Sequence, residues 1–246
     1  LSESRKISAG AHYKTAAVCY HFGKFLFVDY PDEMNAAHKN TIECYNKALP
    51  LLSPPGERIN IPYEGKSLYG NLRVPIGSVK PPIVIMAMGL DSTKEEMFTY
   101  ESVFLERGLA TLSFDGPGQG EGEYDFTMCP EYEKPIKAVI SKLKKISTIN
   151  TDKIGLWGVS MGGYYAPRAA AFCAEISACI ALSGPFDLSL CFKNLPELTA
   201  SAVIHRSGSK SDSEITAFTK KMSLENVAYK IKCPLYIVSG SLDKVI

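Results

Sequence analysis

The sequence predicts an α/β fold in which a mostly parallel sheet is flanked by helices and preceded by a helical cap. Two observations carry this prediction. Continuous apolar runs of strand length, typical of strands buried on both faces, alternate with amphipathic helical segments from about residue 83 onward. The first fifty residues instead lack strand alternation and repeat their apolar side chains at helical spacing. Strands that alternate with helices are joined by right-handed crossovers into a parallel sheet.

Residues 1–55 form the predicted helical cap. Apolar residues recur at helical spacing on both sides of Pro31, which predicts a helical hairpin, and the Pro-rich segment 50–56 ends it. The aromatic residues of this region either line a substrate pocket or form the hairpin's own core. They are Tyr13, Tyr20, Phe22, Phe25 and Tyr30.

Residues 56–246 form the predicted α/β domain, with an insertion at about 188–229 that lies with the hairpin over the carboxyl ends of the strands. A hairpin with strands at 58–62 and 67–74 opens the domain. Parallel strands are expected at 83–88, 109–114, 154–159, 178–182 and 234–239. Helices are expected at 93–107, 133–147 and 161–172.

Composition excludes several classes of protein. The chain has 246 residues, of which 46% are hydrophobic, and its net charge of +1 offers no basic surface for nucleic acid or anionic lipid. The longest apolar run is too short to cross a bilayer. The seven cysteines show no C-x-x-C spacing, so we expect reduced thiols, no metal site and a cytoplasmic protein.

The most informative motif is G-x-S-x-G at residues 158–162. It lies between a predicted strand and a predicted helix, which is the context of a nucleophile elbow and distinguishes it from a chance match in a flexible loop. The elbow would hold the Ser160 hydroxyl out of the sheet, and the Met161 N–H at the helix start would face an oxyanion. The second oxyanion donor is expected from the loop after the strand at 83–88, where the N–H of Leu90 or Gly89 is the candidate.

The acid of a serine triad follows a later strand in this arrangement. Asp243 follows the last predicted strand and is favoured, whereas Asp187 is expected to cap or orient the segment after it. The acid precedes the histidine in this chain order, but all four histidines precede Asp243. They are His12, His21, His38 and His205. We expect structural roles for those in the hairpin and the catalytic histidine beyond Ile246, with His205 as the substitute to test.

A glycine-rich stretch follows the strand at 109–114. Its glycines do not match the G-x-G-x-x-G spacing of a dinucleotide site, so no cofactor is expected there. We predict a tight loop in which the Asp115 carboxylate binds the loop's own backbone amides.

Three motifs together resemble α/β-hydrolases with an N-terminal helical domain. They are D-G-P-G-Q-G-E at 115–121, G-x-S-x-G-G-Y-Y-A-P-R at 158–168 and G-L-D-S-T-K-E-E at 89–96. This group contains 2,6-dihydroxypseudooxynicotine hydrolase and the polyketide-shortening hydrolases of fungal pigment synthesis, and the resemblance covers nearly the whole chain. It implies Ser160 as nucleophile and Asp243 as triad acid.

The resemblance favours hydrolysis of a carbon–carbon bond next to a ketone, in a β-diketone or acyl-phenol substrate that can accept the carbanion charge. Some members of the group use a carboxylate near the cap for this step; here Asp187 and Glu197 are nearby, and Cys191 interrupts the region. The alternatives are an esterase or aminoacyl-peptidase-like hydrolase, a thioesterase-like acyl transferase and a non-catalytic binding protein. We expect a small-molecule substrate and no nucleic acid or membrane partner, and a homodimer is the assembly to test.

Overall fold

A computed structural model describes residues 2–24 and 28–243. Its seven strands are β1 (Gly56–Tyr63), β2 (Lys66–Arg73), β3 (Pro82–Ala87), β4 (Ala110–Asp115), β5 (Asn150–Val159), β6 (Ile176–Leu182) and β7 (Leu235–Val238). They form one sheet in the order β1-β2-β4-β3-β5-β6-β7. β1 and β2 are antiparallel to their neighbours, and the strands from β4 to β7 pair in parallel. The predicted α/β fold with a mostly parallel sheet is therefore confirmed.

The central strands are apolar throughout because helices cover both faces of the sheet. The crossover helices are α3 (Phe98–Leu105), α4 (Glu133–Leu143) and α5 (Gly162–Ala170). In β3, Ile83 and Ile85 enter the core that α4 and α5 cover, whereas Val84 and Met86 enter a second core on the side of α3. Successive side chains of a strand point to opposite faces, so a strand between two cores needs apolar residues at every position.

The segment predicted as a helix over 93–107 is instead divided. A 3₁₀ turn, η2 (Lys94–Glu96), precedes α3, and Met97 lies between them. The Lys94 N–H donates to Asp115 Oδ1 at 2.9 Å, and the Lys94 and Glu95 side chains are buried. These long-range contacts hold the first turn in place, which explains why the helical periodicity did not produce one continuous helix.

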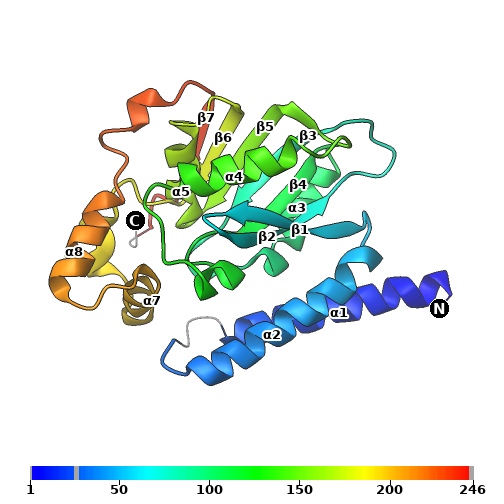
Figure 1. The fold of residues 1–246 in the computed structure, drawn as a ribbon, viewed down its shortest axis with the longest axis horizontal. Helices are drawn as coiled ribbons and strands as arrows, with labels where there is room; N and C mark the ends of the chain where they lie inside the picture. Colours follow the sequence, from blue (N-terminus) through cyan, green and yellow to red (C-terminus); the bar gives the residue numbers. More distant parts are fainter. Residues whose placement is uncertain (1, 25–27, 244–246) are drawn as a thin grey trace.

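The N-terminal helices α1 (Glu3–Lys24) and α2 (Pro31–Ala48) form a hairpin that lies side by side below the sheet in Figure 1. Its core consists of Ala17, Tyr45, Ala48, Leu49 and Leu52. Of the described aromatic residues that we expected in a pocket or in this core, none belongs to the core, and Phe22 lines a cavity between α1 and the start of α3. Tyr13, Tyr20, Phe22 and Tyr30 are 38–62% exposed, and Phe25 lies outside the described residues. Ala17, Tyr45 and Ala48 fill the contact between the two helices instead.

The insertion between β6 and β7 forms the helices α6 (Leu188–Cys191), α7 (Glu197–Ser207) and α8 (Asp212–Lys221). Figure 1 shows α7 and α8 at the end of the molecule where β7 leads to the C-terminal label. β7 is the last strand of the sheet, and its four residues are at least 36% exposed. Among the described residues, no helix combines the length and the apolar character needed to cross a membrane.

Candidate active site

Ser160 occupies a strained turn between β5 and α5. Its φ of +54° lies in the left-handed region, which non-glycine residues rarely adopt. Backbone hydrogen bonds hold it there, because the Ser160 N–H donates to Leu182 O at 2.8 Å and its carbonyl accepts from the Gly163 N–H at 2.7 Å. The serine itself is solvent-exposed. This geometry agrees with the predicted elbow.

The glycines of the motif are required by close backbone approach. A Cβ on Gly158 would lie 1.9 Å from Gly162 O, and a Cβ on Gly162 would lie 2.0 Å from Ala87 O. Both distances are far below van der Waals contact, so neither position accepts a side chain without movement of the backbone. The missing side chains therefore let α5 begin directly against the ends of β3 and β5.

The loop after β3 passes beside the serine. A Cβ built on Gly89 would lie 3.2 Å from Ser160 Cβ and 3.6 Å from Ser160 Oγ. Within residues 2–24 and 28–243, the N–H groups of Met161, Leu90 and Gly89 donate to no protein acceptor. Two unused backbone donors near an exposed serine are what an oxyanion hole requires.

The two candidate acids lie at the same edge of the sheet as Ser160, because each follows a parallel strand. The Asp187 carboxylate accepts hydrogen bonds from the Ser189 N–H at 2.8 Å and from Ser189 Oγ at 2.5 Å, so it caps α6 as expected. Asp243 follows β7, where its N–H donates to Gly240 O at 3.1 Å. β5 and β7 are separated by one strand, or about 10 Å between axes, a gap that an imidazole can bridge.

No histidine nitrogen in the described part of the chain forms a hydrogen bond to Ser160 Oγ. His38 Nδ1 lies 2.6 Å from the Tyr124 hydroxyl, and His21 is buried 2.7 Å from Glu96 and 3.3 Å from Thr93 Oγ1. Both therefore join the hairpin to the α/β domain, as their position predicts. His12 and His205 are exposed on α1 and α7.

The glycine-rich loop after β4 is organised by Asp115, as predicted. Its buried carboxylate accepts from the Glu121 N–H at 3.0 Å and from the Lys94 N–H at 2.9 Å. We did not predict the Lys94 side chain, whose Nζ lies 2.6 Å from Asp115 Oδ2, 2.6 Å from Glu121 Oε1 and 2.7 Å from Glu95 Oε1. Burial lowers the pKa of Lys94, but the three carboxylates outweigh burial and raise it, so the ammonium stays charged. Its only signal in the sequence is the K-E-E run after the Gly89 loop.

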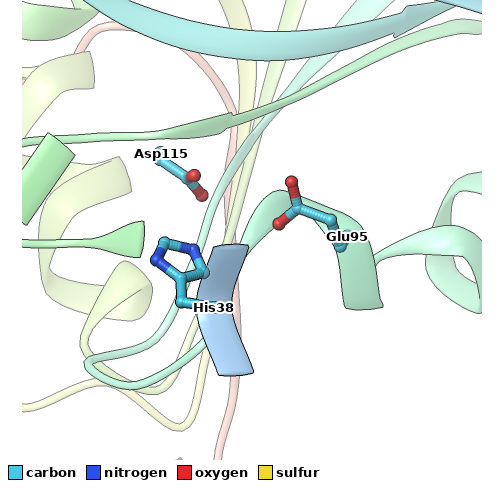
Figure 2. Close-up of side chains that lie close together, drawn as sticks. All are labelled: His38, Glu95 and Asp115. Carbon is cyan, nitrogen blue, oxygen red and sulfur yellow. The ribbon is translucent and has the colours of Figure 1, made fainter. Parts of the chain in front are cut away.

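Figure 2 shows three side chains that resemble a metal-ligand set: His38, Glu95 and Asp115, whose ligand atoms lie within 4.8 Å of one another. The Lys94 ammonium, which bonds both carboxylates, already supplies the positive charge that they need. Burial, together with the nearby Lys24 charge, lowers the pKa of His38 to about 3, so this imidazole is neutral. We therefore assign the cluster to the attachment of the hairpin.

The family model of the FrsA-like esterases matches residues 1–235. The chain belongs to the FrsA-like esterase family. This FrsA-like chain is 37% identical over 240 residues to 2,6-dihydropseudooxynicotine hydrolase of Paenarthrobacter nicotinovorans, a match that covers 97% of the chain and 65% of the relative. It is 31% identical over 209 residues to hydrolase acrC of Aspergillus aculeatus, covering 74% of the chain and 48% of that relative.

A crystal structure of 2,6-dihydroxy-pseudo-oxynicotine hydrolase superposes with a TM-score of 0.92 at 36% identity, covering 98% of the FrsA-like chain and 68% of the other. The chain thus spans about two thirds of the length of the first of these two curated relatives and about half of the second. The predicted resemblance to this hydrolase group is confirmed.

Proposed function

We propose that this chain carries the nucleophile of a cofactor-independent serine hydrolase. The observation that carries the proposal is the left-handed φ of Ser160 between β5 and α5. A strained, exposed serine at a turn from strand to helix is the geometry of a nucleophile elbow. Family membership supports the same reading, since the relatives include two named hydrolases.

In the proposed reaction, Ser160 Oγ attacks a substrate carbonyl carbon while a histidine accepts the hydroxyl proton. The N–H groups of Met161 and Leu90 bind the oxyanion that forms. The protonated histidine then donates its proton to the leaving group, and water hydrolyses the acyl-enzyme to release the acid. Asp243 orients the histidine, which we propose lies outside the 246 residues of this sequence.

We propose a carbon–carbon bond next to a ketone as the bond that is cleaved, in a β-diketone or acyl-phenol substrate. The support is the resemblance to the hydrolase group that contains 2,6-dihydroxypseudooxynicotine hydrolase, with which the chain shares 37% identity. A carbanion leaving group needs a ring or an enol to accept its charge, which restricts the substrate to such ketones.

Ester hydrolysis is the second candidate, and two observations favour it. The family is described as an esterase family. Of the two carboxylates singled out in the sequence, moreover, Asp187 is held as a helix cap and Glu197 is exposed in the first turn of α7. Ester cleavage needs only the triad and the oxyanion hole.

The test uses the natural full-length protein and compares acylphloroglucinol-type ketones with p-nitrophenyl esters and aminoacyl anilides. We expect kcat/KM to be highest for a ketone, and Ser160→Ala to remove turnover of every substrate. If the esters or anilides exceed every ketone by a hundredfold, about 2.7 kcal/mol of transition-state preference, ester or amide hydrolysis replaces carbon–carbon cleavage.

A further inference from the structure

The side chain of Gln119, in the glycine-rich loop after β4, reaches the loop after β3 that flanks Ser160. This side chain is fully buried, and its Nε2 donates to Met88 O at 2.8 Å and to Gly89 O at 2.7 Å. One carboxamide therefore uses both of its N–H donors on two successive carbonyls of the loop that flanks Ser160.

The peptide geometry turns this contact into a constraint on the oxyanion donors. In a trans peptide, the C=O of one residue and the N–H of the next point in opposite directions. The Met88 carbonyl belongs to the peptide that carries the Gly89 N–H, and the Gly89 carbonyl belongs to the peptide that carries the Leu90 N–H. Because Gln119 holds both carbonyls, it directs both N–H groups to the opposite side of the loop.

The orientation of the Gln119 amide is itself fixed. The Tyr132 hydroxyl donates to Gln119 Oε1 at 2.8 Å, which leaves Nε2 as the group that faces the loop. Tyr132 is fully buried, and its ring stacks on Tyr165 of α5 with centroids 3.8 Å apart. A rigid chain of contacts thus runs from the helix that follows Ser160 to the loop that flanks it.

A second side chain fixes the next carbonyl of the loop. The Arg206 guanidinium, on α7 of the insertion, donates to Leu90 O and to Asp91 Oδ1, the latter at 2.6 Å. Three successive carbonyls, those of Met88, Gly89 and Leu90, are therefore bound from within the protein, which restrains the backbone on both sides of the Leu90 N–H.

We propose that Gln119 is the positioning residue of the oxyanion hole, holding the Leu90 N–H toward the tetrahedral oxyanion at Ser160. The inference rests on the proposed serine chemistry and extends it to a residue that never touches the substrate. Preorganised donors act on the transition state far more than on the bound substrate. Loss of Gln119 should thus lower kcat and leave KM nearly unchanged.

The experiment uses the natural full-length protein with p-nitrophenyl acetate as substrate, phenylboronic acid as tetrahedral analogue and a fluorophosphonate as covalent label. Gln119→Met keeps the side-chain length and removes both donors. We expect kcat and the labelling rate to fall about a hundredfold, the Ki of the boronate to rise by a similar factor, and KM to change less than threefold. A merely structural role would lower the melting temperature without separating Ki from KM.

Tyr132→Phe is the milder variant, which retains Gln119 and removes only the bond that orients its amide. Its matched control is Tyr164→Phe, which also deletes one buried hydroxyl, donating to Pro130 O at 2.9 Å, but does not touch the loop. We expect kcat to fall about tenfold in Tyr132→Phe and to stay unchanged in Tyr164→Phe.

Two results would overturn the inference and are distinguishable. If the fluorophosphonate labels the natural protein and Gln119→Met keeps its labelling rate, or Tyr132→Phe matches Tyr164→Phe in kcat, the positioning role is wrong while the serine chemistry stands. If the natural protein is not labelled at Ser160 at all, the proposed function fails, and the positioning role fails with it.

Discussion

Replacing Lys94 by Met should destabilise the fold severely, because it removes the positive charge from a buried group of carboxylates. Lys94 is fully buried, and its ammonium lies within 2.7 Å of Asp115, Glu95 and Glu121. Methionine retains the apolar part of the side chain, so the substitution tests the charge more than the packing.

The magnitude follows from what is left behind. Removing one partner of a buried ion pair costs about 3–5 kcal/mol, since the other charge stays desolvated and unpaired. A domain with a free energy of unfolding of about 5–15 kcal/mol would lose a fifth of its stability or more. The loss should shrink at acid pH, where the buried carboxylates of the variant take up protons.

The assay is urea unfolding followed by the fluorescence of Trp157, the single tryptophan, which is buried on β5 against Tyr100 and Phe104 of α3. The matched control is Lys66→Met, which breaks the ion pair with Asp125 at 2.5 Å, where the lysine side chain is 55% exposed. Such exposed pairs contribute about 0–1 kcal/mol. Equal losses of stability in the two variants at pH 7 would refute the reasoning.

Three further predictions concern the elbow, the hairpin and the acid. Gly158→Ala should unfold the protein or lower its melting temperature by 10 °C or more, on the order of several kcal/mol, because its Cβ would meet a backbone oxygen at 1.9 Å, whereas Gly23→Ala, with open space around it, should be neutral. His38 has a pKa of about 3 in the folded state and about 6.5 when unfolded, so its contribution to stability is complete above pH 6.5 and is lost as pH falls toward 3. His38→Phe should therefore flatten the dependence of the urea midpoint on pH in that window, and an unchanged slope would contradict the assignment. Asp243→Asn should lower kcat by about 10⁴, whereas Asp187→Ala should cost about 1 kcal/mol of stability and leave kcat within threefold. If Asp187→Ala instead caused the large loss of kcat and Asp243→Asn did not, Asp187 would be the triad acid.

The elements predicted well from the sequence are those whose geometry is local. The elbow at Ser160 requires only a strand, a glycine-flanked serine and a helix in succession, and the loop amide bound by Asp115 lies six residues away. Asp187 caps the helix that begins at the next residue. Such features depend on neighbours in the chain, which the sequence displays directly.

The features that were missed depend on distant partners. Gln119 binds carbonyls 30 and 31 residues away, and Lys94 binds Asp115 only because β3 and β4 are neighbours in the sheet. The prediction that aromatic residues such as Tyr13 and Tyr20 form the core of the hairpin was wrong for a related reason. Helical periodicity identifies which residues share a stripe, but it does not tell which stripe is buried, and here the buried stripe carries Ala17, Tyr45 and Ala48. The cytoplasmic location, the homodimer and the domain boundaries stay predictions.

The most direct test of the central claim, that Ser160 is the nucleophile, is mass-spectrometric mapping of a fluorophosphonate adduct on the natural full-length protein. The account predicts a single adduct on the peptide that contains Ser160, formed with loss of fluoride, and no adduct in Ser160→Ala. Circular dichroism of the variant should match that of the natural protein, because the hydroxyl has no structural partner among the described residues. An adduct on another residue, or equal labelling of Ser160→Ala, would contradict the account.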